Sequence, residues 1–169
     1  MAEFFETIQL FLEAGGNVLI VILLATMFLW TLIFERTLYF YREFPKHEKA
    51  LVEKWQQYRK ADKWTHDAVR TQLISEARLG LMDHIPMIKT LVALAPLLGL
   101  LGTVTGMISV FDVMAVTGTG NARLMASGIS MATIPTMAGM VAALSGLYFG
   151  TLLESAAKNR VKLIADKLS

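Results

Sequence analysis

The chain has 169 residues, a formal net charge of +2, 54% hydrophobic residues and a mean hydropathy of +0.50. Such a composition leaves little sequence for a soluble domain, so we expect one all-α integral membrane domain over residues 1–169. The absence of cysteine excludes disulfides and thiolate metal sites. The small net charge gives no indication of nucleic-acid binding, and we expect no enzyme activity, catalytic residue, metal or cofactor.

Residues 1–13 carry apolar side chains at helical spacing, with polar ones largely opposite. The apolar members are Phe4, Phe5, Ile8, Phe11 and Leu12. This pattern predicts a short helix in the outer membrane interface, ended by Gly15 and Gly16. Residues 1–13 contain no Lys or Arg, so they lack the basic region of a signal peptide, and the first span is expected to be retained.

Three stretches are uncharged: residues 14–34 (21 residues), 90–111 (22 residues) and 124–153 (30 residues). Because a membrane-spanning helix needs about 20 apolar residues, they predict three transmembrane helices. The predicted segments are span 1 (14–34), a cytoplasmic helical region (35–89), span 2 (90–112), a periplasmic loop (113–123), span 3 (124–153) and a cytoplasmic tail (154–169). Thirty residues make a helix of about 45 Å, so the third helix should tilt or extend into the cytoplasm.

The positive charges set the expected orientation. Of the 16 Lys and Arg residues, 11 lie between Glu35 and Lys89, four follow Leu153, and Arg123 lies beside the short loop. The positive-inside rule therefore places the 35–89 region and the C-terminus in the cytoplasm and the N-terminus outside.

Helix-forming sequences cover 46–60 and 64–83 in the cytoplasmic region, after a break at Pro45. Pro86 is expected in a first turn or at a kink. The three histidines, at positions 47, 66 and 84, are scattered among charges and are interpreted as solvated surface rather than metal ligands. Turn-forming residues at 117–121 predict that spans 2 and 3 form an antiparallel hairpin.

Small residues form one stripe on each of the later spans. Projected at 100° per residue, the stripe on span 3 is about 80° wide. Close approach through small residues is how helices associate in lipid, so these stripes are predicted to serve helix packing and oligomerisation. The residues assigned this role are Gly99, Gly102, Gly106, Gly128, Gly139 and Gly146, accompanied by Ala95, Ala132, Pro135, Ala142 and Gly150.

Two threonines are expected near the middle of the membrane. Thr103 lies nine residues before Asp112, or ~14 Å along a helix, and Thr136 lies 13 residues after Arg123, or ~20 Å. Thr133 shares the polar face of span 3. The alternative is that each hydroxyl only bonds the carbonyl four residues earlier in its own helix.

The spans contain no central charged residue or histidine, so coupled transport would need a carboxylate from a partner. Asp112, at the outer end of span 2, is interpreted as a solvated interfacial carboxylate.

The segment Ala95-Pro96-Leu97-Leu98-Gly99-Leu100-Leu101-Gly102-Thr103-Val104 resembles a signature of the ExbB/TolQ/MotA proton-channel family. Gly128-Ile129 through Thr136, with Gly139 and residues 141–143, resembles the third-helix motif of that family. In size and number of spans the chain is more similar to ExbB or TolQ than to MotA, and it looks like a short ExbB.

The resemblance implies a pentamer in the bacterial inner membrane that surrounds two helices of an ExbD-type single-span partner, whose intramembrane Asp carries the proton. It further implies that proton-motive force becomes mechanical work on a TonB-type protein for uptake of iron complexes or a vitamin. Thr103 and Thr136 then correspond to the pore-lining threonines, and Thr133 is placed on the same proton pathway. Membrane lipid is the remaining expected partner.

The chain departs from the family pattern at two positions. Met131 stands where the ExbB motif has a Glu, and Pro135 replaces a small residue before Thr136. Three alternatives stay open: the Tol-Pal envelope system or a gliding or flagellar motor within the same family, a membrane scaffold without transport, and a self-sufficient channel.

Overall fold

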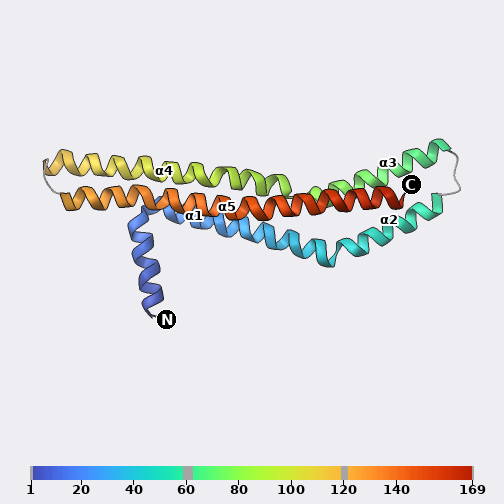
Figure 1. The fold of residues 1–169 in the computed structure, drawn as a ribbon, viewed down its shortest axis with the longest axis horizontal. Coiled ribbons are helices and arrows are strands. Elements are labelled where there is room, and N and C mark those ends of the chain that lie inside the picture. The colour runs from blue at the N-terminus through green and yellow to red at the C-terminus, as the bar shows by residue number, and fades with distance from the viewer. Residues whose placement is uncertain (1, 59–62, 119–121, 169) are drawn as a thin grey trace. The chain divides into compact units, whose positions relative to one another are not determined.

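The computed structural model describes residues 2–58, 63–118 and 122–168, with side chains for most residues from Gly15 onward. These residues form five helices and no strand: α1 (Ala2–Arg42), α2 (Phe44–Tyr58), α3 (Lys63–Met82), α4 (Ile85–Thr117) and α5 (Ala122–Lys167), shown in Figure 1. The helix α5 has 46 residues, a length of about 69 Å. The predicted all-α fold is confirmed.

Three stretches of the described residues are long and apolar enough to cross a membrane: Gly15–Arg42, Trp64–Val116 and Met125–Lys167. Each overlaps one of the uncharged runs recognised in the sequence. The structure therefore confirms three transmembrane segments, carried by α1, α4 and α5.

The breaks between helices occur at residues with special backbone properties. Gly16 interrupts α1 with φ 66° and ψ −171°, a conformation that glycine adopts readily because it has no Cβ. Pro45 and Pro86 occupy the first turns of α2 and α4, where the missing N–H costs no helical hydrogen bond. His84, between α3 and α4, has φ 59°, which is uncommon for a residue with a side chain.

Of the predicted turn at 117–121, Thr117 is the last residue of α4, and Gly118 has a positive φ of 76°. The remaining residues of that turn, 119–121, lie outside the described part of the chain. The predicted end of the N-terminal helix at Gly15 and Gly16 agrees with the kink at Gly16. The predicted location of that helix in the membrane interface stays a prediction.

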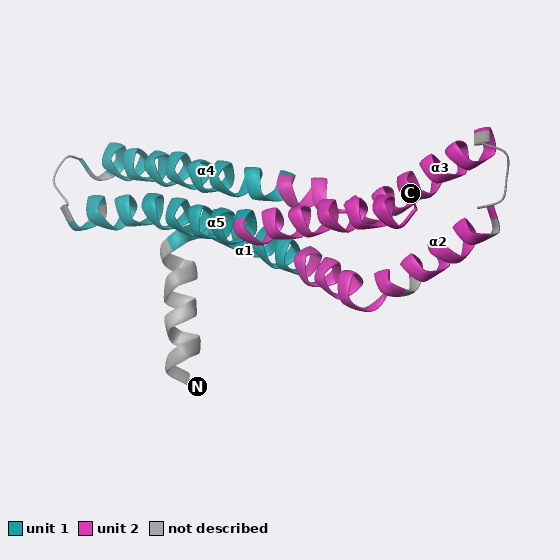
Figure 2. Cartoon of the chain, turned by 45° about the vertical axis from the view of Figure 1, so that its right-hand side comes forward, with its two compact units in different colours: residues 1–30, 90–147 teal, residues 31–89, 148–169 magenta. Residues whose placement is uncertain are grey.

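The chain divides into two compact units, coloured separately in Figure 2. Unit 1 comprises residues 1–30 and 90–147, and unit 2 comprises residues 31–89 and 148–169. The divisions fall close in sequence to the predicted ends of the three spans. Unit 1 therefore contains most of the uncharged sequence, and unit 2 contains most of the charged sequence.

Within unit 1, α4 and α5 pack through the small residues of both predicted stripes. A Cβ added to Gly106 would lie 2.6 Å from Ala132 Cα, and one added to Gly139 would lie 2.5 Å from the carbonyl oxygen of Ala95. Such distances are shorter than real Cβ contacts, so only glycine lets the two backbones approach this closely.

Unit 2 is held by large apolar side chains and ion pairs. Its core contains residues from all five helices: Phe40, Phe44, Leu51, Trp55, Leu73, Ala77, Leu81, Ile85, Ala157, Ile164 and Leu168. At its periphery Glu154 Oε2 lies 2.7 Å from Lys89 Nζ, and Glu154 Oε1 lies 3.0 Å from Lys158 Nζ. Arg70 donates hydrogen bonds to the carbonyl oxygens of Leu168 at 3.0 Å and Ala165 at 3.2 Å, near the C-terminal end of α5.

Candidate threonine site in unit 1

Thr103 of α4 and Thr136 of α5 meet directly. Their hydroxyl oxygens are joined by a hydrogen bond across the two helices. The Thr136 hydroxyl also donates to the Gly99 carbonyl oxygen at 3.1 Å, and the Thr103 hydroxyl lies 3.5 Å from that same oxygen. Two hydroxyls predicted at mid-span thus converge on one backbone carbonyl, and both side chains are partly buried.

The hydrogen bond between the two hydroxyls can be donated by either of them. A hydroxyl has one donor and two acceptor lone pairs. In the arrangement where Thr136 donates to Gly99 and Thr103 donates to Thr136, the Thr103 oxygen keeps its lone pairs available for another donor.

Glycines bring the two threonines together. A Cβ on Gly99 would lie 3.0 Å from Thr136 Cα and 3.1 Å from the Pro135 carbonyl oxygen. A Cβ on Gly102 would overlap the Pro135 side chain, which is fully buried. Pro135, a departure from the family pattern, thus fills the space beside Gly102 and adjoins Thr136 in sequence.

The other predicted packing glycines also act within the chain. A Cβ on Gly128 would overlap the Val110 side chain, and one on Gly146 would lie 2.6 Å from Leu29 of α1 and 2.7 Å from Val92 of α4. These glycines, together with Gly99, Gly102, Gly106 and Gly139, are already used for contacts inside unit 1. Their assigned part in oligomerisation stays a prediction.

Thr133 is not brought to the threonine pair. It is exposed, and its hydroxyl donates to the Ser130 carbonyl oxygen of its own helix at 3.2 Å. The Thr133 hydroxyl thus bonds the carbonyl three residues earlier in its own helix, and a role for Thr133 in a proton pathway stays a prediction.

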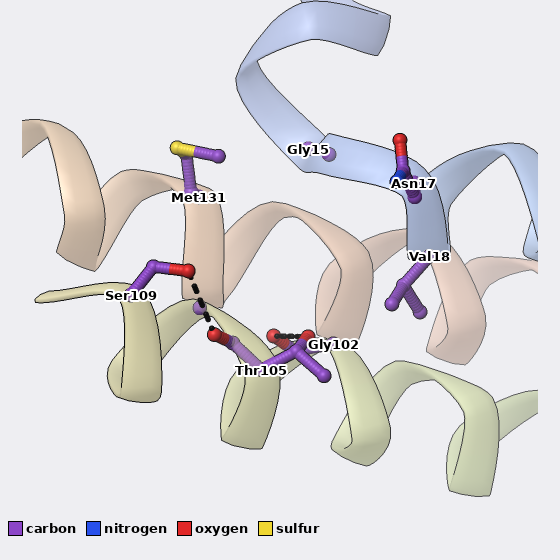
Figure 3. A pocket seen from close by; sticks show the side chains of 9 residues that line it. Gly15, Asn17, Val18, Gly102, Thr105, Ser109 and Met131 are labelled. Atoms are coloured by element: carbon purple, nitrogen blue, oxygen red, sulfur yellow. Dashed lines mark hydrogen bonds between the residues drawn. The ribbon is translucent and has the colours of Figure 1, made fainter. Parts of the chain in front are cut away.

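A cavity of about 360 Å³ lies in unit 1, close to the kink of α1 (Figure 3). It is lined by Gly15, Gly16, Asn17, Val18, Gly102, Thr105, Gly106, Ser109 and Met131. Thr105 donates to the carbonyl oxygens of Leu101 at 3.0 Å and Gly102 at 3.1 Å, and Ser109 donates to that of Thr105 at 3.2 Å. Met131 lines this cavity together with Thr105 and Ser109 (Figure 3).

Sequence reasoning missed that Asn17, Thr105 and Ser109 line one cavity. A signal was available, because Thr105 and Ser109 are four residues apart and therefore share a face of α4. The contribution of α1 depends on the kink at Gly16, and spacing along α4 or α5 carries no information about it.

The surroundings of the threonine pair are electrically neutral in sequence, because residues 90–111 and 124–153 contain no Asp, Glu, Lys, Arg or His. Asp112 is exposed in the C-terminal part of α4, nine residues beyond Thr103. The arrangement offers hydroxyl groups that can exchange hydrogen bonds.

Comparison with known proteins gives an independent measure of relatedness. Two proteins of Synechocystis sp., named ExbB-like 1 and ExbB-like 3 and described in their names as biopolymer transport proteins, are similar to this chain. The first is 47% identical over 72 residues, which cover 41% of this chain and 28% of the relative. The second is 32% identical over 96 residues, which cover 55% of this chain and 46% of the relative. The matches thus span less than half of either relative's length.

The family match covers more of the sequence. Residues 43–166 match the family described as the MotA/TolQ/ExbB proton channel family. The matched region includes both members of the threonine pair, all of the packing glycines and most of unit 2. This agrees with the resemblance found in the motifs of α4 and α5, and the chain therefore belongs to the MotA/TolQ/ExbB proton channel family.

Proposed function

We propose that this membrane protein is the subunit of a proton-driven motor of the ExbB type, acting with an ExbD-type single-span partner. In this proposal several copies, five by family resemblance, surround the partner's helices in a bacterial inner membrane, with the N-terminus outside and the C-terminus in the cytoplasm. The observation that supports this proposal is the hydrogen-bonded pair Thr103–Thr136 in an uncharged part of the spans.

The pair suits a carboxyl group that gains and loses a proton. When the partner's carboxyl is protonated, its O–H donates to the available lone pairs of the Thr103 oxygen. When it ionises, the Thr103 hydroxyl turns its proton from Thr136 to the carboxylate, while Thr136 remains bonded to Gly99. A hydrogen bond to the ionised form favours it, so a hydroxyl here lowers the cost of deprotonation without adding a fixed charge.

The names of the two relatives describe them as ExbB-like biopolymer transport proteins. On this basis we propose work on a TonB-type protein for this chain, with a Tol-Pal role as the alternative within the family. A non-transporting scaffold is the second candidate, because the pair's hydrogen bonds stay inside the chain and hold α4 to α5 in any case. The two candidates differ in what loss of the hydroxyls should do.

The test is proton flux in proteoliposomes that contain this chain with its ExbD-type partner. The double variant Thr103→Val, Thr136→Val keeps the side-chain shapes and removes both hydroxyls, so flux should fall about 100-fold or more, the lower end of what proton-transfer groups contribute. Thr103→Ser and Thr136→Ser, which restore the hydroxyls, should recover it. Full flux in the double valine variant would contradict the proposal and favour the scaffold.

A matched control is Thr26→Val in α1, where the hydroxyl only donates to the Ile22 carbonyl oxygen of its own helix at 2.7 Å. It makes the same chemical change in another span and should leave flux unchanged. Equal losses in Thr26→Val and the double variant would show that the loss reflects general helix damage.

The need for a partner can be tested separately. Liposomes holding this chain alone should conduct no protons, because the uncharged spans offer no central titratable group. Flux without the partner that Asp112→Asn abolishes would instead place the proton site in this chain and support a self-sufficient channel.

A further inference from the structure

Unit 2 contains an apolar groove that the proposed function does not use. It has a volume of about 300 Å³ and lies between the end of α1 and the middle of α5. Its lining residues are Thr37, Phe40, Tyr41, Phe149, Leu152, Leu153, Ala156 and Arg160. Apart from Thr37, every uncharged member presents aromatic or aliphatic carbon, and Arg160 is the only charged residue of the set.

The groove begins in the apolar sequence of a span and ends at a cation. Phe149 belongs to the uncharged stretch that closes at Leu153, whereas Arg160 lies in the basic sequence that follows. Arg160 lies eleven positions after Phe149, about 17 Å along the helix, and seven positions, about 10 Å, beyond Leu153 at the predicted end of the span. Helical side chains tilt toward the N-terminus of their helix, so the Arg160 side chain leans back toward the apolar end.

Arg160 retains capacity to bind an anion. Its Nη1 lies 3.9 Å from Glu48 Oε2, a long contact, and Glu48 has a closer partner in Lys167 Nζ at 2.5 Å. The Arg160 guanidinium carbon lies 5.8 Å from the centre of the Phe44 ring, which fixes one face of the group, while 42% of the side chain remains exposed. A planar guanidinium can bind a phosphate through two hydrogen bonds.

We infer that this groove binds one anionic phospholipid, with an acyl chain along Phe149 and Leu152 and the phosphate at Arg160. The apolar lining favours a ligand with an acyl chain over a free phosphate. The Arg160 cation favours an anionic headgroup over a zwitterionic one. In the proposed orientation the lipid comes from the cytoplasmic leaflet, where basic pockets beside membrane helices bind such headgroups. The groove lies in unit 2 and the threonine pair in unit 1, so lipid binding does not depend on whether the pair carries protons.

The test is native mass spectrometry of the full chain, delipidated and offered equal amounts of phosphatidylglycerol and phosphatidylcholine with identical acyl chains. Phosphatidylglycerol should be retained about fivefold more, the ratio expected from one basic residue near a headgroup. Arg160→Gln should abolish that preference, and Arg160→Lys should keep part of it. Equal retention of the two lipids, or an undiminished preference in Arg160→Gln, would overturn the inference.

Two further variants locate the site. Lys162→Gln removes the same charge from an exposed residue of α5 that does not line the groove, so it should preserve the preference. Ala156→Trp fills the groove and should reduce retention of both lipids. If Ala156→Trp retains phosphatidylglycerol fully, or Lys162→Gln acts like Arg160→Gln, the lipid binds elsewhere and the groove assignment is wrong.

A second copy of the chain is the competing occupant. Leu152→p-benzoylphenylalanine places a photo-crosslinker in the groove, where 49% of the native leucine is exposed. Irradiation in liposomes should add the mass of one phospholipid to the chain. A crosslinked dimer of the chain instead would show that another subunit covers the groove, and would overturn the inference.

Discussion

The two units use opposite means to hold helices together. In unit 1 the close contacts between α4 and α5 include glycine, alanine and proline, and many large side chains are exposed, among them Leu97, Leu100, Val104 and Ile108. In unit 2 the centre is made of large side chains, and Phe44, Leu51, Leu81 and Ile164 are each no more than 1% exposed. Both packings are built on the same continuous helices α1, α4 and α5.

The two units pack differently because the composition of unit 1 suits lipid and the composition of unit 2 suits water. Lipid tails are as apolar as leucine, so burying large side chains gives helices in lipid no advantage, and close backbone contact becomes the main source of cohesion. In water, removing a leucine or phenylalanine from solvent stabilises a fold by about 1.5–3 kcal/mol per residue. Substituting a packing residue should therefore change stability differently in the two units.

The largest effect is expected from shortening a core residue of unit 2. Leu81→Ala should lower the free energy of unfolding by about 2–5 kcal/mol, because it removes buried carbon and leaves a cavity. Leu79→Ala is the matched control on the same helix: this leucine is 74% exposed, so its loss should change stability by about 0.5 kcal/mol or less. Thermal unfolding in detergent, followed by circular dichroism, measures both. Equal losses would show that unit 2 is not organised around this core.

The second largest difference between the units is expected from replacing a glycine by alanine. Gly106→Ala places a methyl group against Ala132 and should destabilise unit 1 by about 1–3 kcal/mol through overpacking. In unit 2, Gly80→Ala adds a Cβ that would meet only the Tyr39 hydroxyl at 3.5 Å, and alanine's helix propensity should make the change neutral or stabilising by up to about 1 kcal/mol. The same unfolding measurement applies. A neutral Gly106→Ala would refute close packing between α4 and α5.

A smaller effect is expected at the threonine pair. A double-mutant cycle on Thr103→Val and Thr136→Val should give a coupling energy of about 0.6 kcal/mol, with ~1.7 kcal/mol as the upper range for hydrogen bonds between membrane helices. The coupling energy measures the contribution of the pair to stability, which is separate from its effect on proton flux. A coupling energy of zero would mean that the hydroxyls do not bond each other in the folded protein.

The smallest effect is expected at the ion pairs of unit 2. Glu154→Gln should weaken the contacts to Lys89 and Lys158 only slightly, because all three side chains reach solvent. The difference from the native chain should shrink further at about 1 M salt, where charges are screened beyond ~3 Å. A loss of stability as large as that of Leu81→Ala would assign these ion pairs a central part in unit 2.

Much of the architecture could be predicted from where charges are absent. The uncharged runs located the three spans, and glycines recurring on one face of α5 identified the side that packs on α4. Thr103 and Thr136 were placed at similar depths by counting from Asp112 and Arg123, and antiparallel neighbouring helices then bring such residues together. Helical periodicity is informative here because one helix packs against one neighbour.

Contacts that involve a third helix could not be predicted in this way. The kink at Gly16 turns α1 so that Asn17 joins Thr105 and Ser109 around a cavity, and Gly146 contacts Leu29 of α1 as well as α4. Thr133 was grouped with Thr136 because both lie on one broad polar face. It differs because its hydroxyl bonds its own helix, and projection at 100° per residue does not resolve that choice.

The backbone of His84 has a consequence for natural variation in this family. At φ 59° an ordinary side chain is strained, whereas glycine is not, and asparagine, aspartate and histidine tolerate the conformation better than other residues. Relatives that keep the α3–α4 turn should therefore vary at this position among those four residues and avoid valine, isoleucine and threonine. A D-amino acid favours positive φ. Introduced by chemical synthesis at position 84 it should therefore be compatible with the fold, whereas at position 85, inside α4, it should disrupt the helix.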